Sequence, residues 1–255
     1  MKFIDTHTHI YLPEFDTDRE LSVARAASGG VEKLLMPGID LESLDRMLAA
    51  EVFFPGICYP MMGLHPTSVK EDVDYQLDRM EDLWSARKFI AVGETGIDLY
   101  WDRTFITQQK EALRRQINLA LREQVPVVIH SRDSFPEVFS ILDEFSGTGL
   151  RGVLHAFTGG EKEAEHAIRL GFMLGIGGIV TFKNSGLDKV VGQAGPENLI
   201  LETDSPYLAP TPHRGKRNES SYIPLINKKL AEIFGKDEEY IASVTYENAV
   251  SLFNL

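Results

Sequence analysis

Short apolar segments alternate with longer amphipathic segments along the whole chain. Each apolar segment is rich in Val, Ile, Leu, Phe or Met, and a turn signal or a polar residue follows it. Nearly continuous hydrophobicity, without strict alternation, is typical of parallel strands that are covered on both faces. We therefore predict eight strands, at residues 2–5, 31–36, 57–64, 89–92, 125–129, 152–154, 172–176 and 199–201.

The segments between these strands have the apolar spacing of amphipathic helices. The clearest is residues 104–123, where Ile106, Leu113 and Ile117 recur at helical intervals. Only residues 177–198, after the seventh strand, have a weak helical pattern. We predict further helices at residues 19–27, 41–50, 75–87, 134–145, 161–170, 223–234 and 237–253.

Eight strand-then-helix units predict an α/β protein, a single TIM (β/α)₈ barrel with its active site at the C-terminal ends of the strands. No linker, low-complexity tract or fixed repeat marks a boundary, so we expect one domain over residues 1–255. A doubly wound sheet is the alternative, since one helix is weak.

Composition narrows the class of protein. The chain has 255 residues, 43% of them hydrophobic, with 26 basic and 38 acidic side chains and a net charge of −12. That charge argues against a protein that coats nucleic acid. A single cysteine, Cys58, suits a reducing compartment, and the early charges of Met1-Lys2-Phe3-Ile4-Asp5 do not fit a signal peptide. We expect a cytoplasmic protein that does not contact a membrane.

Residues that can bind a divalent metal ion follow six of the eight predicted strands. In a parallel barrel these positions surround the active site. Five of the seven histidines fall there, whereas a random distribution would scatter them over helices and loops. Histidines hydrogen-bonded within the core are the alternative interpretation. The residues, in strand order, are His7 and His9, His65, Glu94, His130, His155 and Asp204.

The spacing of His7 and His9 has a direct structural meaning. Residues i and i+2 of a strand point to the same face, so both imidazoles can approach one ion, with Asp5 as a partner behind them. Mixed imidazole and carboxylate ligands suit Mg²⁺, Mn²⁺ or Zn²⁺, and the lack of thiolates argues against a structural zinc site. So many ligands favour two ions about 3.5–4 Å apart, bridged by a carboxylate such as Glu94.

Other candidate residues lie at the same end of the predicted barrel. Asp204 is a candidate metal ligand or base. Glu202 lies two residues before Asp204 and is therefore expected on the same face of the strand. There it either assists Asp204 or takes part in a salt bridge. Arg132, Lys183 and the basic loop of residues 212–217 are expected to bind a phosphate, as are the glycines of residues 175–178. Tyr100 and Trp101 either stack on a base or cover the edge of the barrel. Within the basic loop the substrate-binding candidates are Arg214 and Lys216.

These motifs together resemble the TatD family of metal-dependent deoxyribonucleases, a branch of the amidohydrolase-like barrels. The resemblance implies one ion held by His7, His9, Glu94 and Asp204, and a second held by Glu94, His130 and His155. It also implies that His65 contacts the substrate phosphate. Ala156, Thr158 and Ile97 depart from the usual family residues without removing a ligand. The matching stretches are residues 5–9, 63–66, 93–98, 130–132, 155–159, 202–208 and 214–218.

The resemblance implies a divalent-metal-dependent phosphodiesterase that trims single-stranded DNA from an end, as a 3'-5' exodeoxyribonuclease. Metal-activated water would attack phosphorus, with Asp204 assisting the proton transfer and with Arg132 and Arg214 holding the developing charge. A small-molecule amidohydrolase or esterase on the same barrel is the alternative, and a metal-binding protein without catalysis is another. Glu94 stands where many ring-opening amidohydrolases have a modified lysine. We expect a monomer.

Overall fold

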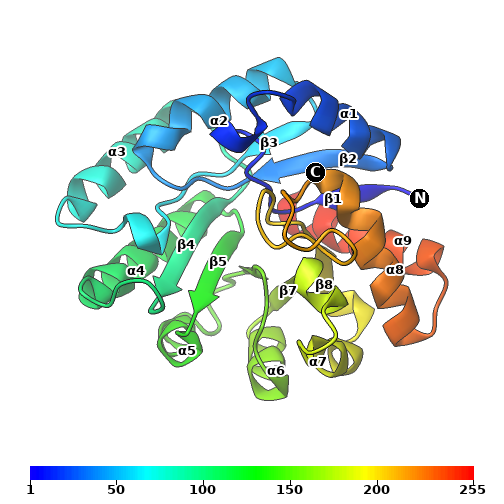
Figure 1. Cartoon of the computed structure of the whole chain (residues 1–255). Helices are drawn as coiled ribbons and strands as arrows, with labels where there is room; N and C mark the ends of the chain where they lie inside the picture. Colours follow the sequence, from blue (N-terminus) through cyan, green and yellow to red (C-terminus); the bar gives the residue numbers. More distant parts are fainter.

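The computed structural model describes residues 1–255, with strands and helices alternating along the chain (Figure 1). The strands are β1 (Phe3–Asp5), β2 (Val31–Met36), β3 (Cys58–Pro60), β4 (Val92–Asp98), β5 (Val127–Arg132), β6 (Gly152–Leu154), β7 (Phe172–Ile176) and β8 (Leu199–Leu201). The helices are α1 (Arg19–Ser28), α2 (Leu41–Phe53), α3 (Val73–Ala86), α4 (Ile106–Glu123), α5 (Phe135–Glu144), α6 (Glu161–Arg169), α7 (Leu187–Ala194), α8 (Ile223–Phe234) and α9 (Glu238–Phe253).

The strands form a parallel ring that consists of two sheets. They pair in chain order as β1-β2-β3 and as β4-β5-β6-β7-β8. Backbone hydrogen bonds cross both gaps: the Gly93 N–H donates to the carbonyl oxygen of Met62 at 2.9 Å, and the Thr6 N–H donates to that of Leu201 at 3.1 Å. The predicted TIM barrel is confirmed, and the alternative of a doubly wound sheet is wrong because β1 lies beside β8.

Apolar side chains fill the interior of the ring and close its N-terminal end. Ile4, Leu35, Val128 and Ile200 belong to one buried cluster that Leu252 joins from α9. Helix α9 packs on both β1 and β8, at the seam of the barrel. The other helices lie around the outside of the ring (Figure 1). The interior is therefore a packed core, and polar side chains gather at the C-terminal end.

Three strands differ from the prediction by several residues, and one of them, β5, runs from Val127 to Arg132 where residues 125–129 were predicted. Strand β4 begins at Val92 and continues to Asp98, beyond the predicted segment of residues 89–92. Its polar residues Glu94, Thr95 and Asp98 are buried and interrupt the apolar pattern, which is why the pattern located the strand too early. Strand β3 ends at Pro60, so His65 lies in the loop that follows it. The weak pattern of residues 177–198 does contain a helix, α7.

None of the helices combines the length and the apolar character that a bilayer span requires.

Candidate metal centre

Glu94 lies at the centre of the imidazoles that the sequence placed at the strand ends. Its side chain is only 3% exposed. One carboxylate oxygen, Oε2, faces the two histidines that follow β1, at 3.1 Å from His7 Nε2 and 3.8 Å from His9 Nε2. The other, Oε1, lies 3.0 Å from His155 Nε2 and 2.9 Å from His130 Nδ1. A single carboxylate therefore separates two groups of nitrogen donors.

Asp204 completes the group around His7 and His9. Its Oδ1 atom lies 3.5 Å from His9 Nε2 and 3.8 Å from His7 Nε2. The Asp204 N–H donates to the carbonyl oxygen of His7 at 2.9 Å, which fixes the position of the residue against the segment that follows β1. The side chain is 15% exposed, more than that of Glu94, so it is the carboxylate that meets the open end of the barrel.

Hydrogen bonds behind the cluster determine which ring nitrogen of His9 faces it. The Tyr11 hydroxyl donates to the carbonyl oxygen of Pro37 at 2.6 Å. Because a hydroxyl has one proton, it must accept at its 3.1 Å contact with His9 Nδ1, which therefore carries a proton. In a neutral ring the lone pair is then on Nε2, the atom that faces Glu94 and Asp204. This is the state that a metal ligand requires.

The carboxylates of Glu202 and Asp98 fix the protonated nitrogens of two further histidines, as the Tyr11 hydroxyl does for His9. Glu202 Oε1 lies 3.2 Å from His155 Nδ1, and Asp98 Oδ2 lies 3.0 Å from His130 Nε2. Carboxylates accept hydrogen bonds, so they hold protons on these nitrogens and leave the opposite nitrogens for the cluster.

Glu202 lies behind His155 and does not face the open end of the barrel. Its Oε1 atom also accepts the Ala156 N–H, and it forms no salt bridge with Lys or Arg. A Cβ atom at Gly175 would lie 2.3 Å from Glu202 Oε2, so the glycine there makes room for this carboxylate. This packing accounts for Gly175 without the phosphate contact that the sequence suggested.

His65 differs from the other four histidines. The Thr67 N–H donates to His65 Nδ1 at 3.1 Å, so Nδ1 carries the lone pair and Nε2 carries the proton in the neutral ring. That N–H lies 3.3 Å from Glu94 Oε1. Burial lowers the pKa of His65, which favours the neutral form. His65 therefore presents a hydrogen-bond donor to the site, whereas partners on the far nitrogens of His9, His130 and His155 leave their other nitrogens facing the cluster for a metal ion.

Burial and the attraction between opposite charges together set the pKa values of Glu94 and His155. Burial alone would raise the pKa of Glu94, but the attraction of His155, His65 and His7 holds it well below its usual range. Burial would likewise lower the pKa of His155, yet Glu94 and Glu202 raise it well above its usual range. Glu94 is thus an anion at neutral pH, and a divalent cation that binds here would displace a proton from His155.

Asp5 fastens β1 to the loop after β8. Its Oδ1 atom accepts the Thr203 N–H at 2.9 Å, and its Oδ2 atom accepts the Thr203 hydroxyl at 2.6 Å. Full burial raises the pKa of Asp5 to about 7. It also accepts the backbone N–H of His7, so it supports that residue through the main chain and not through the imidazole.

The basic residues around the open C-terminal end of the barrel differ in whether an acidic side chain already pairs with them. Arg132 and Arg214 form no ion pair and stack on aromatic rings, with Arg132 3.8 Å from the centroid of Tyr100 and Arg214 4.1 Å from that of Phe182. Lys183 and Arg214 line a cavity of about 630 Å³, and Lys216 is exposed nearby in sequence. Arg217, by contrast, is bound to Asp18 at 2.7 Å. The unpaired cations remain available to a ligand.

Asp98, Tyr11 and Thr67 contact the centre but were not among the residues predicted from the sequence. Tyr11 continues the i, i+2 series of His7 and His9, and Asp98 lies four residues after Glu94 on β4. Parity along a strand was therefore a signal for Asp98, whereas Tyr11 lies beyond the end of β1 and only its even spacing from His7 and His9 pointed to it. For Thr67 there was none, because its contact with His65 depends on a turn of the loop.

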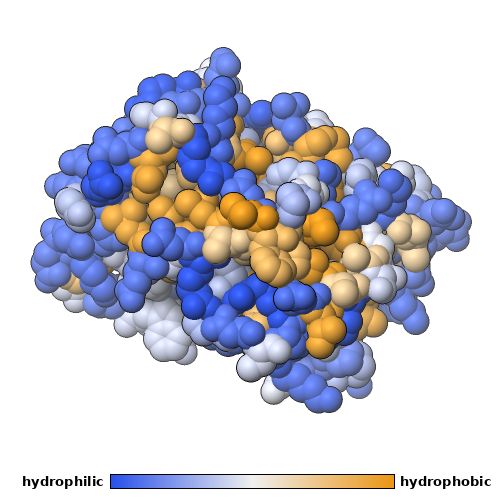
Figure 2. Space-filling model, turned by 90° about the horizontal axis from the view of Figure 1, so that it is seen from above, coloured by the Kyte–Doolittle hydropathy of each residue, from blue (hydrophilic) through white to orange (hydrophobic).

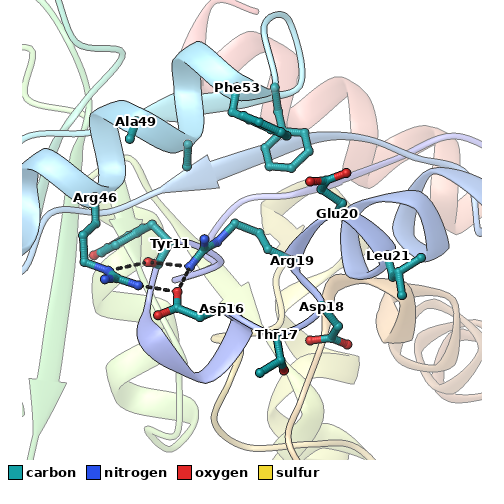
Figure 3. Close-up of a pocket in the computed structure, with 12 residues that line it drawn as sticks. Tyr11, Asp16, Thr17, Asp18, Arg19, Glu20, Leu21, Arg46, Ala49 and Phe53 are labelled. Carbon is teal, nitrogen blue, oxygen red and sulfur yellow. Dashed lines mark hydrogen bonds and ion pairs between the residues drawn. The ribbon is translucent and has the colours of Figure 1, made fainter.

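A second pocket lies away from the cluster, between α1 and α2, with a volume of about 590 Å³ (Figure 3). Figure 3 shows Arg19 and Arg46 converging on Asp16, and both guanidinium groups also donate to the carbonyl oxygen of Tyr11. These contacts hold the loop that follows His9.

Figure 2 views the molecule from the side of α1 and α2, where hydrophobic residues gather among hydrophilic ones. The exposed apolar residues of α1 and α2 are Leu21, Val52 and Phe53.

Removing the Tyr11 hydroxyl is expected to weaken metal binding. Tyr11→Phe keeps the ring but releases the proton on His9 Nδ1, and loss of such an outer partner costs about 10- to 100-fold in affinity. Titration of the chelated protein with Zn²⁺ or Mn²⁺ measures the change, and Tyr240→Phe, at an exposed position on α9, serves as the matched control. Equal affinities in the two variants would contradict this role of the hydroxyl.

A (β/α)₈ barrel with imidazoles and carboxylates gathered at the C-terminal ends of its strands is typical of metal-dependent hydrolases. Within that class, a family model described as TatD related DNase matches residues 4–254, and the chain belongs to this family.

Relatives and solved structures agree with that assignment. The chain is 37% identical, over 98% of both chains, to the uncharacterized metal-dependent hydrolase YabD of Bacillus subtilis. It is 32% identical to the 3'-5' ssDNA/RNA exonuclease TatD of Pectobacterium atrosepticum, over 98% of this chain and 99% of that one. The crystal structure of YjjV, a TatD homologue of Escherichia coli, superposes with a TM-score of 0.93 at 32% identity, covering 99% of this chain and 98% of that one.

Proposed function

We propose that this metal-dependent hydrolase cleaves phosphodiester bonds of DNA and acts as a 3'-5' exodeoxyribonuclease on single strands. The observation that carries the proposal is the position of Glu94 between two donor groups, beside the N–H of His65. A site of this kind suits a substrate with negatively charged oxygens. The names of several relatives, which include 3'-5' ssDNA/RNA exonuclease, support the substrate class.

We further propose that two divalent ions, Mg²⁺, Mn²⁺ or Zn²⁺, bind at the centre. The donor set fits them, because it combines imidazole lone pairs with carboxylates that are ionised at neutral pH. His7, His9, Glu94 and Asp204 would hold one ion, and Glu94, His130 and His155 the other. When bound, such ions supply Lewis-acid chemistry and activate water for attack on phosphorus.

The side chains of the chain then have distinct tasks. Asp204 is ionised and partly exposed, so it accepts the proton released by the attacking water. His65 donates its Nε2 proton in a hydrogen bond to a phosphate oxygen. Glu202 assists by holding His155 in place. Arg132, Arg214 and Lys216 neutralise the phosphates of the bound strand at the rim.

End-labelled single-stranded DNA tests the proposal. The purified protein is incubated with Mg²⁺, Mn²⁺ or Zn²⁺ in turn, and with chelator, on strands labelled at the 5' or the 3' end. A ladder that shortens from the 3' end only when metal is present is the expected result. If no metal supports cleavage of DNA while amides or esters are hydrolysed, the alternative of a small-molecule hydrolase is correct.

The His65→Ala variant separates a hydrogen-bond donor from a metal ligand. We expect its hydrolysis of DNA to fall about 100-fold, the typical cost of removing one donor to developing charge. Its metal content, measured by mass spectrometry after dialysis, is expected to equal that of the wild type. His166→Ala, on α6, is the matched control. A loss of bound metal in His65→Ala would instead make His65 a ligand.

The domain organisation, the oligomeric state and the cellular compartment complete the proposal. We propose that residues 1–255 act as one domain and as a monomer, because the donors of the centre all belong to this chain. We also propose that the enzyme acts in the cytoplasm. The single cysteine, Cys58, is buried and free, which suits a reducing compartment.

A further inference from the structure

Two exposed aromatic side chains follow β4 at the mouth of the barrel. Tyr100 is 54% exposed and Trp101 is 69% exposed, whereas the other tryptophan, Trp84, is 5% exposed. The two rings meet edge to face, with their centroids 4.9 Å apart. More than half of each side chain is thus open to a ligand. Exposed aromatic pairs of this kind are typical of binding surfaces.

The aromatic pair is tied to the metal centre by Asp98. The Oδ1 atom of Asp98 accepts the Tyr100 N–H at 3.0 Å and the Trp101 N–H at 3.2 Å. Its Oδ2 atom lies 3.0 Å from His130 Nε2. One carboxylate thus fixes the loop that carries the rings and the imidazole of the centre. A pocket of about 80 Å³ that Trp101 and Asp98 line together extends to Thr67, the partner of His65.

Arg132 adds a cation to this surface. Its guanidinium carbon lies 3.8 Å from the centroid of Tyr100 and 5.3 Å from that of Trp101. Arg132 has no carboxylate within ion-pair distance. In the parallel pairing of β4 with β5, its backbone lies opposite that of Asp98. Stacked aromatic faces with a free guanidinium beside a phosphodiester site are the combination that recognises unpaired nucleobases and their phosphates.

We propose that Trp101, with Tyr100 and Arg132, forms a stacking subsite for one unpaired nucleobase next to the phosphodiester that is cleaved. This rests on the proposed nuclease function and extends it to the bases. A base can lie on these rings only when it is not stacked and paired within a duplex. The subsite therefore selects single strands, and it does so without hydrogen bonds that would read the sequence.

Tryptophan fluorescence tests the subsite without turnover. Oligothymidylate is added to the full chain in chelator and again in Ca²⁺, and the same titration uses a strand of equal length with abasic linkers. We expect oligothymidylate to quench the emission of the wild type and not that of Trp101→Phe, in which only the buried Trp84 emits. The abasic strand is expected to leave both unchanged. Equal quenching by both strands, or none in either condition, overturns the proposal.

Kinetics provide a second test on the metal-loaded enzyme. The wild type is expected to have a KM for an oligonucleotide about tenfold below that for a strand whose terminal bases are abasic, since stacking of a single base supplies a factor of roughly 5 to 150. Trp101→Ala should lose this preference, Trp101→Phe should recover much of it, and Tyr75→Ala, an exposed aromatic on α3, should keep it. If Trp101→Ala keeps the preference, the subsite is wrong. If the wild type cleaves neither strand, the nuclease function itself is wrong.

Discussion

Glu94→Gln is expected to lose its bound metal and about a thousandfold or more of its hydrolytic rate, since metal ions contribute several kcal/mol to catalysis and each 1.36 kcal/mol is a factor of ten. Glutamine has nearly the shape of glutamate, so the change removes charge and one oxygen while leaving the packing intact. Its –NH₂ group must face either His7 or the pair formed by His130 and His155. An –NH₂ group cannot coordinate a cation, so one of the two donor groups loses its shared ligand.

Metal content after dialysis and cleavage of labelled single strands measure this loss. Glu232→Gln, at an exposed carboxylate of α8, is the matched control and should behave as the wild type. Circular dichroism establishes that both variants fold. A Glu94→Gln protein that keeps its metal and its activity would show that the carboxylate does not join two metal positions.

The barrel and the candidate ligands could be predicted because strand geometry connects them. The spacing of His7 and His9 and the convergence of the C-terminal ends of parallel strands led us to expect that residues far apart in sequence would meet. The histidines do meet there, although β1 ends at Asp5 and both follow it. The limits of β4 could not be predicted, since burial of Glu94 and Asp98 is stabilised by the site and not by an apolar pattern. The protonation pattern of His65 depends on a loop contact that no periodicity encodes.

The sequence also could not show which basic side chains around the open end of the barrel are already paired with an acidic residue. Arg214, Lys216 and Arg217 are neighbours in a basic loop and look equivalent in the sequence. In the fold, Arg217 is bound to Asp18, a residue 199 positions away, while Arg214 stacks on Phe182. Only the tertiary structure decides which cation is already neutralised. The net charge of −12 therefore describes the whole chain but not its mouth, where Arg132 and Arg214 are unpaired.

Asp204→Asn is expected to lose most of the catalytic rate while the protein stays folded. The backbone of Asp204 has φ = +57°, a left-handed conformation that asparagine tolerates and most other residues do not. Asparagine is therefore a better test than alanine, which would add strain at this position. Burial would raise the pKa of Asp204, but the neighbouring imidazoles of His9, His155 and His7 lower it, so the wild-type carboxyl is an ionised base.

An asparagine side chain keeps a carbonyl oxygen as a weak ligand but cannot take up a proton, so the two roles of Asp204 separate in the Asp204→Asn variant. We expect the rate of DNA cleavage to fall by about 10²- to 10⁴-fold, the range for removal of a general base. Metal content should fall less than in Glu94→Gln, because Glu94 faces both donor groups and Asp204 only His7 and His9. Thermal unfolding should change by only a few degrees. An Asp204→Asn enzyme that cleaves single strands at the wild-type rate would exclude Asp204 as the base.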